Sequence, residues 1–130
     1  MCVRFGLCEE TTHHILWDCF VAKSVWWSVL VWLKLPFPSF DPSLEQLLGL
    51  VANNNGSRDW KKAVGPVIMV TFWEIWKARN DKHFNNHNVH YNRTADIIKE
   101  KSFFWITSRS KFCNINWARW LDFNIRDAIL

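Results

Sequence analysis

The hydrophobic residues of this chain follow a helical pattern over most of its length. Between residues 15 and 33 the apolar positions recur at spacings of three, four and seven. This spacing predicts an amphipathic helix of about six turns that begins at Thr11 or Thr12. The prolines within residues 35–38 should end this helix, because proline lacks an amide hydrogen and disfavours helical dihedrals in the residue before it.

A long central helix is predicted over residues 57–84. Its apolar positions are nearly continuous from residue 60 to residue 76, so we expect it to be contacted on several sides. Gly65 and Pro66 lie inside it and should kink or break it. Beyond residue 76 the helix becomes polar.

Shorter helices are predicted on either side of the long one. One begins at Asp41 or Ser43, and another is capped by Thr94 after an Asn-rich loop over residues 85–92. A last turn contains two tryptophans that are three residues apart, at positions 117 and 120. The apolar face expected for the helix at Thr94 consists of Ile97, Ile98, Phe104, Trp105 and Ser108.

These elements predict an all-α fold, a small domain of four to five helices with an irregular N-terminus. A chain of 130 residues has the size of one domain. We therefore expect residues 1–130 to form a single domain, with an irregular N-terminal segment over residues 1–20 and a tryptophan-rich helical region over residues 21–130. The ten tryptophans supply a large apolar area, and each buried indole N–H needs an acceptor.

The charge of the chain permits an anionic partner without requiring one. The net charge is +4, but no run of Lys or Arg is longer than two, and a solvated surface explains scattered cations equally well. The acids Glu9 and Glu10 and the lack of an apolar core near the N-terminus argue against a secretory signal. The longest apolar run, residues 25–33, is too short to span a bilayer. We expect an intracellular location, the nucleus included, and no membrane partner.

The N-terminal segment contains a candidate site for structural zinc. His14 and Cys19 are five residues apart, a spacing found in zinc knuckles, and His13 is an alternative to His14. Five residues along an α-helix rotate by about 140°, so a helix must begin after His14 if both side chains are to reach one metal. The alternative is that the cysteines are small buried hydrophobic residues. The candidate ligands are Cys2, Cys8, His14 and Cys19.

Two blocks of the sequence resemble a known family. Residues 10–19 (ETTHHILWDC) and residues 72–80 (FWEIWKARN), followed by Phe84, are similar to the zinc-binding domain at the C-terminal side of plant LINE-type (non-LTR) retrotransposon reverse transcriptases. In that family a CxxC pair precedes ETxxHLFxxC, and a tryptophan-rich helix follows. The resemblance implies that this chain is a degenerate C-terminal fragment of such a protein, without the polymerase that would lie upstream.

The family pattern assigns ligand roles to some of the candidate residues. The resemblance implies zinc ligation by Cys2, His14 and Cys19. The second cysteine of the family falls on Phe5, and Cys8 is our substitute for it. With four protein ligands the zinc would be structural, because no coordination position is left open for catalysis.

The first functional hypothesis is a non-catalytic, zinc-supported module that binds RNA or DNA. Its candidate contacts are Lys77, Arg79 and Lys82, which lie beside Trp76. Cationic side chains bind phosphate, and a nearby aromatic ring can stack on a base. The competing interpretation is an ordinary polar helix end with Trp76 in the core, since cations near a helix C-terminus complement its dipole.

The second hypothesis is a structural or protein-interaction fragment with no metal and no nucleic-acid role. So many aromatic residues on a short chain predict an exposed apolar face, suited to self-association or to the upstream polymerase domain. An enzyme is not expected. Cys113 lacks a nearby histidine in sequence, no acid pair has a recognisable spacing, and we expect no small-molecule substrate.

Overall fold

The protein is described by a computed structural model, which covers residues 16–17, 19–35, 49, 58–87, 90–109 and 116–123. Within these ranges every regular element is helical and no strand occurs, so the predicted all-α fold class is confirmed. The helices are α1 (Phe20–Trp32), α3 (Arg58–Asn85), α4 (Tyr91–Arg109) and α5 (Trp117–Asp122).

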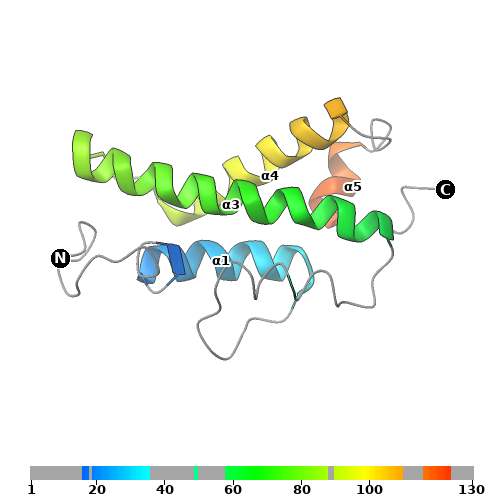
Figure 1. Ribbon diagram of the computed structural model, residues 1–130, viewed down its shortest axis with the longest axis horizontal. Coiled ribbons are helices and arrows are strands. Elements are labelled where there is room, and N and C mark those ends of the chain that lie inside the picture. Colours follow the sequence, from blue (N-terminus) through cyan, green and yellow to red (C-terminus); the bar gives the residue numbers. More distant parts are fainter. Residues whose placement is uncertain are drawn as a thin grey trace.

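Three of these helices form the body of the fold. The helices α3 and α4 run in opposite directions as a closely packed pair, and α1 lies along one side of the pair and contacts both (Figure 1). The short α5 packs at the C-terminal end of α4. The α3–α4 pair therefore has an inner side, which α1 covers, and an outer side.

The core lies where α1 meets the inner side of the α3–α4 pair. Small and branched side chains bring the helices close together, and tryptophan fills the larger spaces. The side chains contributed by the three long helices include Ala22, Val25, Trp26, Val29, Leu30, Ala63, Val64, Val67, Ile68, Ile75, Ile98 and Ile106.

The buried indole N–H groups have acceptors, as expected. The Nε1 atom of Trp26 donates to the carbonyl oxygen of Leu16 at 2.8 Å. Trp32 donates to the carbonyl oxygen of Leu121 at 2.9 Å, and Trp120 donates to that of Lys99 at 2.9 Å. The last two bonds join α1 to α5 and α5 to α4, so tryptophan both fills the core and links its helices.

The helix α1 begins later than the hydrophobic pattern predicts. It starts at Phe20, and Cys19 before it has an extended backbone with φ −58° and ψ 139°. The predicted start at Thr11 or Thr12 lies outside the described residues. The apolar spacing upstream of Phe20 therefore does not mark part of α1.

The helix α3 closely follows its prediction, except at its proline. It ends at Asn85, one residue after the predicted boundary. It passes through Pro66 as one uninterrupted helix, so the break considered at Gly65 and Pro66 is absent. Val64, Val67 and Ile68 around this point are fully buried, and their packing offsets the hydrogen bond that proline cannot donate.

The helix α4 begins three residues before the predicted cap. Its start is set by His90, whose Nδ1 atom accepts a hydrogen bond from the amide of Asn92 at 3.2 Å. The carbonyl oxygen of His90 accepts from the amide of Thr94 at 3.1 Å. His90 therefore occupies the cap position predicted for Thr94, and its ring stacks on Tyr91.

The apolar face predicted for α4 is wrong over its C-terminal half. Phe104 and Trp105 were expected inside, but they are 73% and 42% exposed, and Ser108 is also exposed. A face centred on smaller residues packs against the neighbouring helices instead, because α3 approaches α4 closely there. The buried positions are Thr94, Ala95, Ile98, Ser102 and Ile106.

Of the remaining predicted helices, one is confirmed and one lies largely outside the described residues. The turn at Trp117 and Trp120 is confirmed as α5, which Asn116 caps by accepting from the amide of Arg119 at 2.8 Å. The helix predicted from Asp41 or Ser43 lies outside the described residues, except for Gly49, which is helical. Among the described helices, none has the length and apolar character needed to cross a membrane.

Candidate functional site

The predicted zinc ligands fall mostly outside the described ranges. Cys2, Cys8 and His14 lie there, as does the alternative ligand His13. Cys19 is 1% exposed and packs in the hydrophobic core immediately before α1. Cys19 precedes α1, and Leu16 and Trp17 before it have a π-helical backbone. The described residues contain no cluster of three or more His, Cys, Asp or Glu side chains arranged for a metal.

The cations predicted to contact nucleic acid all lie in the C-terminal half of α3. The guanidinium carbon of Arg79 lies 5.6 Å from the centre of the Trp76 ring. Lys77 is exposed, and the Nζ atom of Lys82 donates to the Oδ1 atom of Asn86 at 2.9 Å. Trp76 is 38% exposed, so the interpretation that placed it in the core is wrong.

These cations do not share one face of α3. A step of two residues turns an α-helix by about 200°, so Lys77 and Arg79 point to nearly opposite sides. Trp76, Arg79 and His83 follow one another at spacings of three and four, which places them on one strip. Arg79 therefore belongs with Trp76, whereas Lys77 lies across the helix, on the side towards α4.

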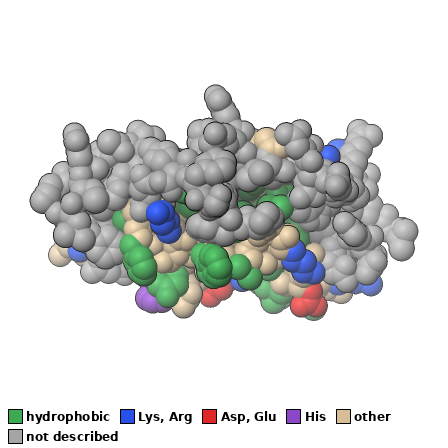
Figure 2. Space-filling model, turned by 90° about the horizontal axis from the view of Figure 1, so that it is seen from below, with side chains coloured by type: hydrophobic (Ala, Val, Ile, Leu, Met, Phe, Trp, Pro, Cys, Tyr) green, Lys and Arg blue, Asp and Glu red, His purple; other side chains and the backbone are tan. Residues whose placement is uncertain are grey.

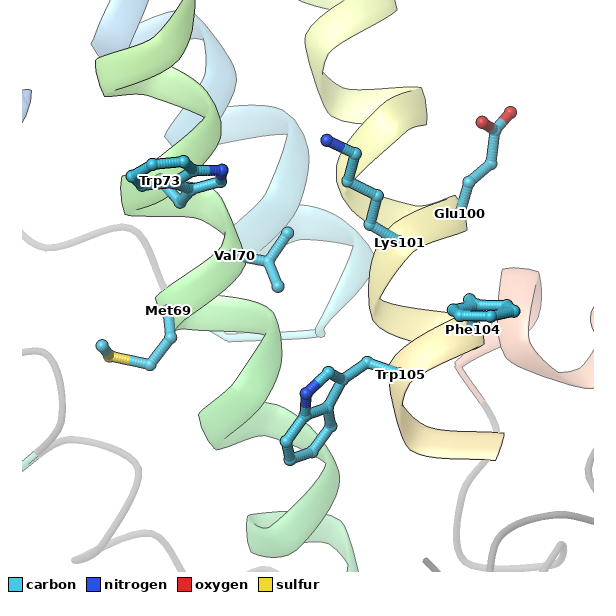
Figure 3. A pocket seen from close by; sticks show the side chains of 7 residues that line it. All are labelled: Met69, Val70, Trp73, Glu100, Lys101, Phe104 and Trp105. Atoms are coloured by element: carbon cyan, nitrogen blue, oxygen red, sulfur yellow. The ribbon is translucent and has the colours of Figure 1, made fainter. Parts of the chain in front are cut away.

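The outer side of the α3–α4 pair contains an open groove of about 500 Å³. In Figure 3 Trp73 and Met69 lie on α3, Phe104 and Trp105 lie on α4, and α1 is behind the pair. The groove is thus on the side away from α1, and its surface is mostly apolar. It is lined by Met69, Val70, Trp73, Glu100, Lys101, Phe104 and Trp105.

A charged pair joins the two helices beside this groove. The Nζ atom of Lys101 on α4 donates to the Oε1 atom of Glu74 on α3 at 2.5 Å. The Glu74 side chain is 6% exposed and that of Lys101 is 45% exposed. The hydrogen bond and the negative charge of Glu74 raise the pKa of Lys101, although its partial burial acts in the opposite direction. Lys101 is therefore held as a cation across the helix pair.

The aromatic walls of the groove reach solvent. Trp73 is 60% exposed and Met69 is 52% exposed, and Phe104 on the other wall is 73% exposed. Figure 2 shows the molecule from below, the side on which α1 lies in Figure 1, and there too the described surface has hydrophobic side chains among charged ones. An exposed apolar face was predicted from the aromatic content, and the described residues contain one.

The exposed apolar stripe of α3, part of which lines this groove, was not predicted from the sequence. Met69, Trp73 and Trp76 are separated by steps of four and three, which marks a second apolar stripe on α3. The almost continuous apolar run hid this stripe, because the buried stripe of Val67, Ile68 and Ile75 is interleaved with it. Two stripes on one helix indicate two packing surfaces.

Comparisons with protein-family models, with curated proteins and with solved structures found no match to this chain. The resemblance to the zinc-binding domain of LINE-type reverse transcriptases therefore stays a prediction from its two sequence blocks.

Proposed function

We propose that this chain is a non-catalytic nucleic-acid-binding module, of the zinc-domain type that accompanies LINE-type reverse transcriptases, and that it contacts single-stranded RNA or DNA through the C-terminal half of α3. The observation that supports this is the pairing of Arg79 with an exposed Trp76. An indole that is open on one face stacks on a base of any sequence, while the adjacent guanidinium binds phosphate.

The cations near this pair have different parts in the proposal. Arg79 donates a hydrogen bond to Asn80 at 2.9 Å, and its guanidinium lies against the Trp76 ring, where it would meet the phosphate of a stacked nucleotide. Lys82 has donors beyond the one that bonds to Asn86. Lys77 lies on the other side of α3 and would contribute through its long-range charge. The main contacts are thus Trp76 and Arg79, with Lys82 beside them.

The same proposal assigns structural zinc to residues 1–20. Cys2, Cys8, His14 and Cys19 would hold the metal, with His13 as the alternative to His14. Cys19 suits this role in two respects, because it is enclosed by protein and it lies immediately before α1. Zinc ligated there would fasten the N-terminal segment to the helices.

The experiment is a titration of fluorescein-labelled oligouridylate RNA with the full chain at 50 mM and 200 mM salt. Each phosphate contact to a single strand contributes a slope of about −0.7 in log affinity against log salt, so contacts from Arg79 and Lys82 predict about a sevenfold loss between these salts. Trp76→Ala should weaken binding by about tenfold, because stacking on one base is lost. Arg79→Ala should weaken binding and flatten the salt dependence.

The matched control is Trp117→Ala. Trp117 is also 38% exposed, but it lies on α5 and contacts the Phe103 ring. The proposal requires that this variant keeps its RNA affinity. Absence of binding, an affinity indifferent to salt, or equal losses in the Trp76 and Trp117 variants would each contradict it.

A further inference from the structure

We propose that the outer groove between α3 and α4 binds an amphipathic helix of a partner protein, with acidic residues along the flanks of that helix. This proposal goes beyond nucleic-acid binding, and the groove is lined by side chains other than Trp76 and Arg79. It rests on the shape of the groove, on the spacing of its apolar residues and on the charges beside it.

The α3–α4 pair forms a groove on each of its two sides. On the inner side the two helices form a groove that α1 occupies, with Trp26, Val29 and Leu30 fully or almost fully buried. On the outer side they form a second groove, which is open (Figure 3). Two adjacent helices present ridges and grooves of similar dimensions on both sides, so a surface that accepts one helix inside suits another outside.

The apolar residues of the outer groove have the spacing of a helix-packing surface. On α3, Met69 and Trp73 are four residues apart and Val70 and Trp73 are three apart, and buried positions on its inner side have the same spacing. Phe104 and Trp105 form the opposite wall from α4. Large apolar side chains more than a third exposed are costly in water, and covering them supplies the main driving force for docking.

The charges beside the groove select the polar flanks of the partner. Lys62 lies two helical turns before Met69 on the same side of α3, Lys77 lies one turn beyond Trp73, and both are exposed. Lys101 adds a third cation, already bonded to Glu74. Among the described groove-lining residues Glu100 is the one exposed acid, and Arg93 lies 3.8 Å from it in an ion pair. Acidic flanks on the bound helix complement this excess of cations.

Two other occupants fit this groove less well. A second copy of this chain would bring its own Lys62 and Lys77 against the same pair, and like charges across an interface are unfavourable. A nucleic acid could stack on Trp73 and Phe104, but Met69 and Val70 have no aromatic face, so the apolar part of the groove suits a helix better than a nucleic acid. An acidic helix from another protein satisfies both the apolar walls and the cations.

The experiment selects binders from a displayed library of helix-forming peptides of about 15 residues. The peptides vary among Leu, Ile, Phe and Met on one face, and among Glu, Lys, Gln and Ser on the flanks, and the full chain is the bait. The proposal expects enriched peptides with Glu at the flanks at least about threefold over Lys, by the complementarity argued above. No enrichment over an unrelated bait, or flanks without a preference for Glu, would overturn it.

Calorimetric titration of one enriched peptide then locates its site. Trp73→Ala and Phe104→Ala should each raise the dissociation constant at least about tenfold, as expected for central aromatic contacts. The matched control is Trp27→Ala, because Trp27 is 58% exposed but lies on α1. Circular dichroism must show that all three variants keep their helix content, and a Trp73 variant that unfolds is replaced by Trp73→Gln. Unchanged affinity in the groove variants, or an equal loss in the control, refutes the site.

Three further measurements test the choice of occupant. Lys77→Glu should weaken the Glu-flanked peptide by about threefold and reverse the preference for Glu over Lys flanks. Light scattering should show a monomer, and a dimer that Trp73→Ala dissociates would mean that a second copy fills the groove. Displacement of the peptide by oligouridylate RNA, together with loss of RNA binding in Trp73→Ala, would make the groove a nucleic-acid surface. Either result overturns the proposal.

Discussion

At the scale of single residues, the contact between Glu74 and Lys101 is a charged interaction that joins α3 to α4. The carboxylate is nearly buried, so it needs a partner to offset the loss of its hydration. The ammonium is 45% exposed and keeps part of its own water. The two residues are 27 positions apart, so the contact also fixes how α3 and α4 align.

Replacing this ammonium should destabilise the fold. Lys101→Met leaves the Glu74 carboxylate without its cation, and we expect a loss of about 1–2 kcal/mol in the free energy of unfolding. That estimate is below the cost for a fully buried pair, because solvent screens the exposed lysine. Urea denaturation followed by circular dichroism gives the value. Lys62→Met, at an exposed position, is the control and should change stability by much less.

The same pair predicts a dependence on alkaline pH. The pKa of Lys101 is raised from 10.5 in the folded chain, so folding favours the protonated form. Its stabilising effect is therefore fully present below about pH 10.5 and is lost as the pH rises through the raised pKa. The stability difference between wild type and Lys101→Met should shrink in that alkaline range. A difference that stays constant to higher pH would contradict this assignment.

For single residues, the sequence predicted which polar groups need a hydrogen-bond partner better than it predicted which side chains are buried. It indicated that buried indoles need acceptors, and Trp26, Trp32 and Trp120 have them. It did not indicate which aromatic residues would be exposed. Phe104 is as apolar as any core residue, and its exposure follows from the orientation of α4 against α3, which depends on contacts across the fold.

At the scale of elements, the sequence predicted the positions of α3 and α5 better than the starts of α1 and α4. The chain leaves α5 through Phe123 in a left-handed conformation with φ 49°, after the two predicted tryptophans. The starts of α1 and α4 were misplaced because Thr11, Thr12 and Thr94 are good capping residues in isolation. In α4 the histidine at position 90 takes that role, and histidine gives a weaker capping signal in a sequence.

The cap of α4 can be tested at this scale. His90→Ala removes the acceptor of the Asn92 amide and should lower the free energy of unfolding by about 0.5–1 kcal/mol, the usual range for a lost cap. His90→Asn should restore most of the loss, because asparagine is a strong capping residue. Amide hydrogen exchange measured by NMR should rise at the first turn of α4 in the alanine variant. His87→Ala, three residues upstream, should leave that turn unchanged.

At the scale of the whole molecule, one aromatic cluster joins α1, α4 and α5. The ring centre of Trp32 lies 5.3 Å from that of Trp120 and 4.9 Å from that of Phe123. The indole of Trp32 donates to carbonyl oxygens of α5, and Lys99 of α4 places its ammonium 5.5 Å from the Trp32 ring. A helix of six residues is too short to be stable alone, so α5 depends on this cluster.

Trp32→Phe tests that dependence. The variant keeps an aromatic ring but loses the donor to the α5 carbonyls, and we expect a loss of about 1–2 kcal/mol in the free energy of unfolding. Hydrogen–deuterium exchange by mass spectrometry should quicken most in α5. Trp27→Phe, which changes an exposed tryptophan of the same helix, should leave exchange in α5 as it is. Equal acceleration across the three long helices would instead indicate a global effect.

The division of the tryptophans between interior and surface has a spectroscopic consequence. Trp17, Trp26, Trp32 and Trp120 are buried, whereas other tryptophans on α1, α3, α4 and α5 are in contact with water. The intrinsic emission of the chain is therefore a sum of a blue component from the interior and a red component from the surface. A water-soluble quencher such as acrylamide removes the red component first. A ligand that covers only the outer side of α3 will shift that component and leave the blue one in place, so an unlabelled chain distinguishes binding at its surface from a change in its interior.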